Sequence, residues 1–216
     1  MIIDTHVHVW EFNSDQFPWS PIGSLAPTFA YPVEKQVDLM AVHNIDAGII
    51  VQTSWYGFDN SYILDCINKY PDKFRLIGMV NPGSELIESE MENLVNRGVI
   101  GFRLAPLLRP DINWKDERFW KKADDLGLSV TLLVDLSQAL SYFHLIKYYP
   151  NTKVVIDHMA HPEKEVDPAN PQFEDFLDMA ELPNLFIKIS ALGVMSKQIY
   201  PHTDMLIFGR RVIEQF

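Results

Sequence analysis

Residues 1–10 read MIIDTHVHVW, and this stretch indicates a buried strand that carries polar groups. The side chains of Asp4, His6 and His8 alternate along it, so in an extended backbone all three point to one face. Apolar neighbours such as Val7 predict that both faces are covered, as in a parallel sheet. Polar groups on a buried face are costly as mere packing. We therefore expect a functional site here; the alternative is a polar strand hydrogen-bonded to its neighbours.

Six further apolar stretches rich in Val, Ile and Leu follow along the chain. They cover residues 47–54, 76–81, 99–105, 129–135, 153–159 and 185–192. Between them, apolar residues recur at helical spacing over residues 33–44, 61–70, 85–98, 116–127, 138–149, 171–182 and 203–216. Buried strands that alternate with helices are typical of a parallel α/β fold, and repeated units of this kind close into a (β/α)8 barrel.

The chain holds seven such strand–helix units, and residue 216 lies at the end of the seventh predicted helix. We therefore expect a (β/α)8 TIM barrel that is truncated before its eighth strand. An open barrel exposes two sheet edges, so either the chain is a shortened version of a longer one or something else covers the gap. No Pro- or Ser-rich linker interrupts residues 1–216, which predicts a single domain. The exposed gap leaves both a monomer and a homo-oligomer open.

Charge and composition exclude several classes of partner. The chain has 18 Lys and Arg against 29 Asp and Glu, a formal net charge of −11, which argues against binding to nucleic acid or anionic membranes. No apolar run reaches the length of a membrane-spanning helix, and the N-terminus lacks a secretory signal pattern. The single cysteine, Cys66, is expected to fill the core. These features favour a cytoplasmic protein.

Polar side chains gather at the carboxyl ends of the predicted strands, where TIM barrels carry their catalytic groups. They are His6, His8, Gln52, Asn81, Arg103, Asp135, His158, Lys188 and Ser190. His158 is the natural third partner for His6 and His8, because three imidazoles at strand ends can hold one divalent cation and leave a position for water. A histidine that only caps the end of its strand is the alternative.

Two other strand ends suit the binding of a small-molecule substrate. Arg103 lies in an apolar strand, where its guanidinium can make bidentate contacts with a carboxylate or ring oxygen; a salt bridge to a neighbouring loop is the alternative. Gln52, followed by Trp55, offers hydrogen bonds and stacking for a sugar-like or aromatic ring, although aromatics of this kind are more often packing. The sequence contains no Gly-rich phosphate loop, G-x-S-x-G motif or CxxC pair, so a nucleophilic side chain is not expected.

Five segments together resemble a known family. They are DTHVHVW (4–10), IIVQTSWYGFDNSYILD (49–65), GMVNP (78–82), GFRLAP (101–106) and VVIDHMAHP (154–162). They resemble the amidohydrolase-related metal-dependent hydrolases of the amidohydrolase superfamily, and most of all the lactonase branch that includes 2-pyrone-4,6-dicarboxylate lactonase and L-fuconolactonase. The resemblance runs across the whole chain.

This resemblance implies a (β/α)8 barrel in which His6 and His8 match the histidine pair of the first strand, and His158 the histidine of the sixth. Arg103 matches an arginine of the fourth strand that holds carboxylate or hydroxyl groups of the substrate. The implied enzyme is a hydrolase that opens a sugar or dicarboxylate lactone with activated water. It would use Zn²⁺ or another divalent cation, or no metal at all.

The chain departs from the family pattern in two places. The fifth strand, SVTLLVD (129–135), has no histidine where many metal-dependent members carry one, which argues against a two-metal site and against the related decarboxylases. The family also ends its eighth strand with an aspartate that serves as general base, and the sequence ends at Phe216 before such a motif. We therefore expect the 216-residue chain to lack that base. The rival hypotheses are a metal-dependent nonoxidative decarboxylase of an aromatic or unsaturated acid, and a noncatalytic ligand-binding truncated barrel.

Overall fold

The computed structural model describes residues 1–20, 27–162, 167 and 169–216. The chain divides into two compact units, Met1–Arg103 and Leu104–Phe216. Strand order in the sheet follows the order of the chain, from β1 to β7. Every strand pair with a recorded register is parallel, as the buried apolar stretches predicted.

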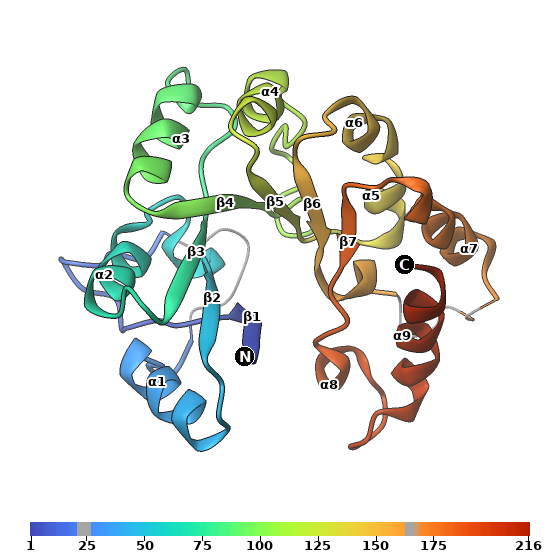
Figure 1. Cartoon of the computed structure of the whole chain (residues 1–216), viewed down its shortest axis with the longest axis horizontal. Helices are drawn as coiled ribbons and strands as arrows, with labels where there is room; N and C mark the ends of the chain where they lie inside the picture. Colours follow the sequence, from blue (N-terminus) through green and yellow to red (C-terminus); the bar gives the residue numbers. More distant parts are fainter. Residues whose placement is uncertain (21–26, 163–166, 168) are drawn as a thin grey trace. The chain divides into compact units, whose positions relative to one another are not determined.

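The first unit is built from alternating strands and helices. Its strands are β1 (Ile3–Val7), β2 (Ala47–Val51), β3 (Phe74–Gly78) and β4 (Val99–Leu104). The last residue of β4, Leu104, is the first residue of the second unit. Its helices are α1 (Val33–Val42), the 3-10 turn η1 (Ser54–Tyr56), α2 (Ser61–Lys69) and α3 (Ile87–Asn96). Helices α1, α2 and α3 lie beside the strands of this unit (Figure 1). Apolar side chains such as Met40, Ile63 and Met91 on these helices are fully buried, so they form its core.

The second unit continues the same alternation. Its strands are β5 (Ser129–Leu132), β6 (Lys153–Ile156) and β7 (Leu185–Ile187). Its helices are α4 (Glu117–Asp125), α5 (Leu136–Leu140), α6 (Phe143–Tyr148), α7 (Pro171–Asp178), α8 (Leu192–Met195) and α9 (Thr203–Gln215), with 3-10 turns η2 (Asp157–Ala160) and η3 (Met179–Glu181). Helices α7 and α9 lie side by side (Figure 1), and the Phe173 and Phe208 rings meet edge to face at 5.0 Å between them.

Local sequence explains where several of these helices start and stop. Asp135 begins α5 with a capping box, in which its carboxylate accepts the Gln138 N–H while the Gln138 side chain accepts the Asp135 N–H. Asn170 caps α7 through the N–H of Gln172, and Pro171 occupies the first helical position. Gly127 follows α4 with a φ of +61°, the left-handed conformation that ends helices at low cost only in glycine.

The structure corrects the sequence-based expectation in three places. The helix predicted over residues 138–149 is two helices, α5 and α6, because the Ser141 hydroxyl donates to the Gln138 carbonyl and competes with the helical pattern. The seventh strand, expected over residues 185–192, ends at Ile187, and helix α8 begins at Leu192. Ile3 in β1 is 45% exposed, so that strand is not covered on both faces; within the described sheet it pairs with β2 alone.

Candidate active site

His6 and His8 form a close pair at the end of β1. Their Nε2 atoms lie 3.1 Å apart, and the two rings meet edge to face with centroids 4.7 Å apart. The Nδ1 atom of His8 lies 2.8 Å from the carbonyl oxygen of Val51, at the end of the neighbouring strand β2. Because a carbonyl only accepts, Nδ1 of His8 carries the proton and its Nε2 presents a lone pair. The alternation read from the sequence therefore does bring both imidazoles to one point.

This pair suits a divalent cation. Imidazole nitrogen is a preferred ligand of Zn²⁺, and the two Nε2 atoms point at the same position from one strand. A backbone carbonyl on the other nitrogen of a metal-binding histidine is the usual support for such a ligand, as Val51 provides for His8. Both rings are half-buried, so a ligand can reach them. The donor set of His6 and His8 thus fits the metal that the sequence suggested.

His158 belongs to the second unit and follows β6 in the turn η2. Its Nδ1 atom lies 2.7 Å from the hydroxyl oxygen of Ser190, which comes just after β7. The backbone of His158 and of the next three residues is left-handed, with φ between 45° and 59°. Such conformations are disfavoured for residues with a Cβ and are found most often at functional sites. The turn therefore holds four consecutive residues with side chains in a strained backbone conformation.

Asp157, beside His158, is fully buried and ion-paired. Its Oδ1 lies 3.2 Å from the ammonium nitrogen of Lys188, which is itself largely buried. Lys188 and Ser190 are two residues apart, so one short segment contacts both Asp157 and His158. The ion pair therefore ties the turn after β6 to the segment after β7.

Arg103 and Gln52 are in direct contact in the first unit. Arg103 is 5% exposed, and its Nη1 donates to the backbone carbonyl of Gln52 over 3.3 Å. The Gln52 side chain is fully buried; it donates to the Asp59 carbonyl and accepts the N–H of Thr53. The Gln52 amide therefore holds the loop that follows β2. Any role for these two side chains in substrate binding stays a prediction.

Trp55 lies in the same loop, in the turn η1. Its ring meets the ring of Trp10 edge to face at 4.8 Å, and its carbonyl accepts the N–H of Ser20. Trp10 comes directly after the strand that carries His6 and His8. The aromatic cluster thus joins the two loops that follow β1 and β2.

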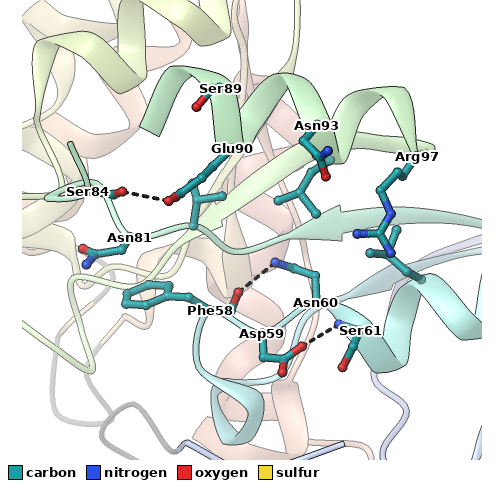
Figure 2. Close-up of a pocket in the computed structure, with 13 residues that line it drawn as sticks. Phe58, Asp59, Asn60, Ser61, Asn81, Ser84, Ser89, Glu90, Asn93 and Arg97 are labelled. Carbon is teal, nitrogen blue, oxygen red and sulfur yellow. Dashed lines mark hydrogen bonds between the residues drawn. The ribbon is translucent and has the colours of Figure 1, made fainter. Parts of the chain in front are cut away.

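A pocket of about 750 Å³ lies beside the loops that follow β2 and β3 (Figure 2). Its lining residues come mostly from these loops and from α2 and α3, and the labelled side chains are chiefly amides, hydroxyls and charged groups. Asn60 supports its floor: the side-chain amide donates to the carbonyls of Phe58 and Met79, and its oxygen accepts the Met79 N–H. Asn60 could not be identified as a supporting residue from the sequence, because no linear motif shows its partners.

Comparison with known proteins agrees with the resemblance seen in the motifs. Residues 3–216 match the amidohydrolase family model. A 4-sulfomuconolactone hydrolase of Hydrogenophaga intermedia is 24% identical over 225 residues, which cover 98% of this chain and 69% of that protein. An L-fucono-1,5-lactonase of Burkholderia ambifaria is 24% identical over 214 residues, which cover 94% of this chain and 71% of that protein.

Solved structures share the fold of this chain. A probable 2-pyrone-4,6-dicarboxylic acid hydrolase from Acinetobacter baumannii, with citric acid bound, has a TM-score of 0.81 at 23% identity and covers 97% of this chain and 76% of its own. An amidohydrolase from Burkholderia multivorans with bound zinc has a TM-score of 0.80 at 19% identity, over 100% and 80% of the two chains. At these identities the likeness shows the fold alone. Since the family model spans nearly every residue, the chain belongs to the amidohydrolase family.

Proposed function

We propose that this protein hydrolyses a lactone, a cyclic ester of a sugar acid or of a dicarboxylic acid. The observation that carries the proposal is the convergence of the Nε2 atoms of His6 and His8 at 3.1 Å, at a strand end of an amidohydrolase-family chain. Relatives named for the hydrolysis of 4-sulfomuconolactone, L-fucono-1,5-lactone and 2-pyrone-4,6-dicarboxylic acid support the substrate class.

In this proposal the three strand-end histidines act on the ester carbonyl. Because the Nε2 of His8 presents a lone pair, His6, His8 and His158 would polarise the carbonyl and stabilise the negative charge on its oxygen through a divalent cation that they hold. The proton of the attacking water would pass to a general base, which in the family pattern is the aspartate of the eighth strand. Arg103 orients the substrate through a carboxylate or hydroxyl group, while Gln52 and Trp55 shape the neighbouring wall. The buried position of Arg103 strengthens such a contact, because a charged hydrogen bond gains strength away from bulk water.

A divalent cation fits the same residues. His6, His8 and His158 would hold Zn²⁺ or a similar ion, which would lower the pKa of a bound water and polarise the carbonyl. The paired Nε2 atoms of the first unit and the zinc bound to the Burkholderia multivorans relative support this assignment.

The proposal also covers where the protein works. No helix in the described part of the chain has the length and apolar character needed to cross a bilayer. The single buried cysteine suits a reducing compartment, and we place the enzyme in the cytoplasm, as a monomer or homo-oligomer that acts on a small molecule.

A pH-indicator screen of sugar and dicarboxylate lactones, with and without a chelator, tests the proposal. The 216-residue protein is assayed beside a version extended through an eighth strand that carries the aspartate of the family pattern. In the active form, His158→Asn should lower turnover at least ~100-fold if His158 contributes to stabilising the reacting carbonyl. His144→Asn is the matched control, since His144 is an exposed histidine on α6 of the same unit. Near-normal turnover in His158→Asn would remove His158 from the site. Release of CO₂ from an unsaturated acid, without hydrolysis of any lactone, would show that the protein is a decarboxylase and not a lactonase.

A further inference from the structure

The two units support a strand-end histidine in the same way. In the first unit, the Nδ1 of His8, which follows β1, contacts the carbonyl oxygen at the end of β2. In the second unit, the Nδ1 of His158, which follows β6, contacts the hydroxyl oxygen of Ser190 just beyond β7. Each imidazole is thus held through Nδ1 by an oxygen from the next strand along the sheet.

We propose that Ser190 is a positioning residue for His158. The hydroxyl oxygen of Ser190 accepts a hydrogen bond from the Nδ1–H of His158, so that the Nε2 atom of the ring presents its lone pair to the site. This inference rests on the proposed function for the role of His158. It deepens that function by assigning the tautomer in which the ring works. A hydroxyl can accept as well as donate, so the 2.7 Å contact allows Ser190 to serve as the Val51 carbonyl serves His8.

Backbone hydrogen bonds join the segment that carries Ser190 to residues on either side of His158. The N–H of Lys188 donates to the Ile156 carbonyl, and the N–H of Met159 donates to the Lys188 carbonyl. The Lys188 side chain in turn pairs with Asp157. The segment that carries Ser190 therefore has a set distance from the turn that carries His158.

The side-chain torsions of His158 need a separate support. The turn is shaped by its neighbours, since Met159 and Ala160 are fully buried and the left-handed backbone continues through His161. The ring of His161 meets the ring of His158 edge to face, with centroids 5.1 Å apart, which bears on the orientation of the ring. The Ser190 hydroxyl contacts the Nδ1 atom of His158, and an oxygen on one ring nitrogen favours the tautomer in which that nitrogen carries the proton.

The first experiment reads the tautomer directly. Long-range ¹H–¹⁵N correlation spectra of histidine-labelled protein are recorded at a fixed alkaline pH where the imidazole is neutral, with His158→Asn used to assign the signals. The wild-type ring is expected as the Nδ1–H tautomer, and Ser190→Ala is expected to populate the Nε2–H tautomer. An Nε2–H tautomer in the wild type would overturn the proposal by itself, whether or not the variant folds.

The second experiment separates positioning from folding. Ser190→Ala should lower kcat by about 10- to 100-fold and change KM by less than about 2-fold, the range found when outer supports of a functional histidine are removed. Ser190→Thr keeps a hydroxyl and should restore most of the turnover. Ser137→Ala, an exposed serine on α5, should leave kcat unchanged.

The two readouts distinguish the ways in which the idea can fail. If neither the 216-residue protein nor the version extended through the eighth strand hydrolyses a lactone, the proposed function is defeated, while the tautomer spectra still decide the Ser190 contact. An active wild type whose kcat and tautomer are unchanged by Ser190→Ala overturns the positioning role alone. A loss of turnover that Ser190→Thr does not rescue also overturns it, because the hydroxyl is then not the group that matters.

Discussion

The Nε2 atoms of His6 and His8 face each other across 3.1 Å, and the Val51 carbonyl fixes the tautomer of His8 from behind. This arrangement leaves a nitrogen lone pair beside a second imidazole at one strand end. Two side chains that approach so closely share either one proton or one cation.

Removal of one ring of this pair should weaken metal binding. His6→Ala is expected to lower the affinity for Zn²⁺ by at least ~10-fold, because one of the proposed nitrogen ligands is lost. Competition against a chromophoric chelator measures the affinity. His43→Ala is the control, since His43 is an exposed histidine at the end of α1. Equal Zn²⁺ affinity in wild type and His6→Ala would contradict the assignment.

Asn60 should be important for stability. Its amide makes three hydrogen bonds to the backbone of Phe58 and Met79, and truncation leaves the buried Met79 groups without these partners. Asn60→Ala should lower the free energy of unfolding by about 2–3 kcal/mol, the usual cost of unsatisfied buried polar groups. Urea denaturation measures this. Asn93→Ala, on α3 in the same pocket lining, should cost well under half as much, and an equal loss in both variants would refute the role of Asn60.

The buried ion pair between Lys188 and Asp157 predicts an asymmetric response to mutation. Lys188→Met should cost about 3–5 kcal/mol, because it leaves a fully buried carboxylate without its ammonium partner. Adding Asp157→Asn should recover part of this loss, which a double-mutant cycle in urea would measure. Lys147→Met should cost less than about 1 kcal/mol, since its partner Glu181 is exposed at 3.8 Å. If the losses in unfolding free energy from Lys188→Met and Asp157→Asn simply add, the two side chains do not stabilise each other.

Cys66 should resist alkylation in the folded protein. Burial raises the pKa of its thiol to about 12, and only the thiolate reacts. Because the shift is upward, the thiolate fraction near pH 8.5 is far smaller than in the unfolded chain, where the thiol ionises at its ordinary value. Iodoacetamide labelling at pH 8.5 should therefore be slow until urea unfolds the protein. Rapid labelling of the native protein would show that the thiol is accessible.

Much of the fold could be predicted because its signals are local. Continuous apolar stretches indicated all the strands found in the described residues, and Gly98 and Gly127 mark the ends of α3 and α4 with positive φ values. Cys66 was expected in the core and is 1% exposed. The closeness of His6 and His8 followed from the two-residue repeat of a strand.

The rest depends on contacts that a linear pattern does not contain. The left-handed turn from His158 to His161 contains no glycine that would predict it from the sequence. The N–H of Met159 in this turn donates a hydrogen bond to the carbonyl of Lys188, which is distant in the sequence. Ser190 was noticed as a polar strand-end residue, but its partner lies 32 positions away. The division of the predicted helix at Ser141 depends on one side-chain hydrogen bond to a carbonyl.

Because His8 and His158 each contact an oxygen from the neighbouring strand or from the segment just after it, the geometry of these two side chains depends on the register of the strands. A slip of β7 by a single residue against β6 would carry the Lys188 and Ser190 side chains to the opposite face of the sheet. Asp157 and His158 would then lose both contacts at once. Misregistered chains with intact secondary structure would be inactive, so activity in this fold is a sensitive assay of correct strand alignment during folding.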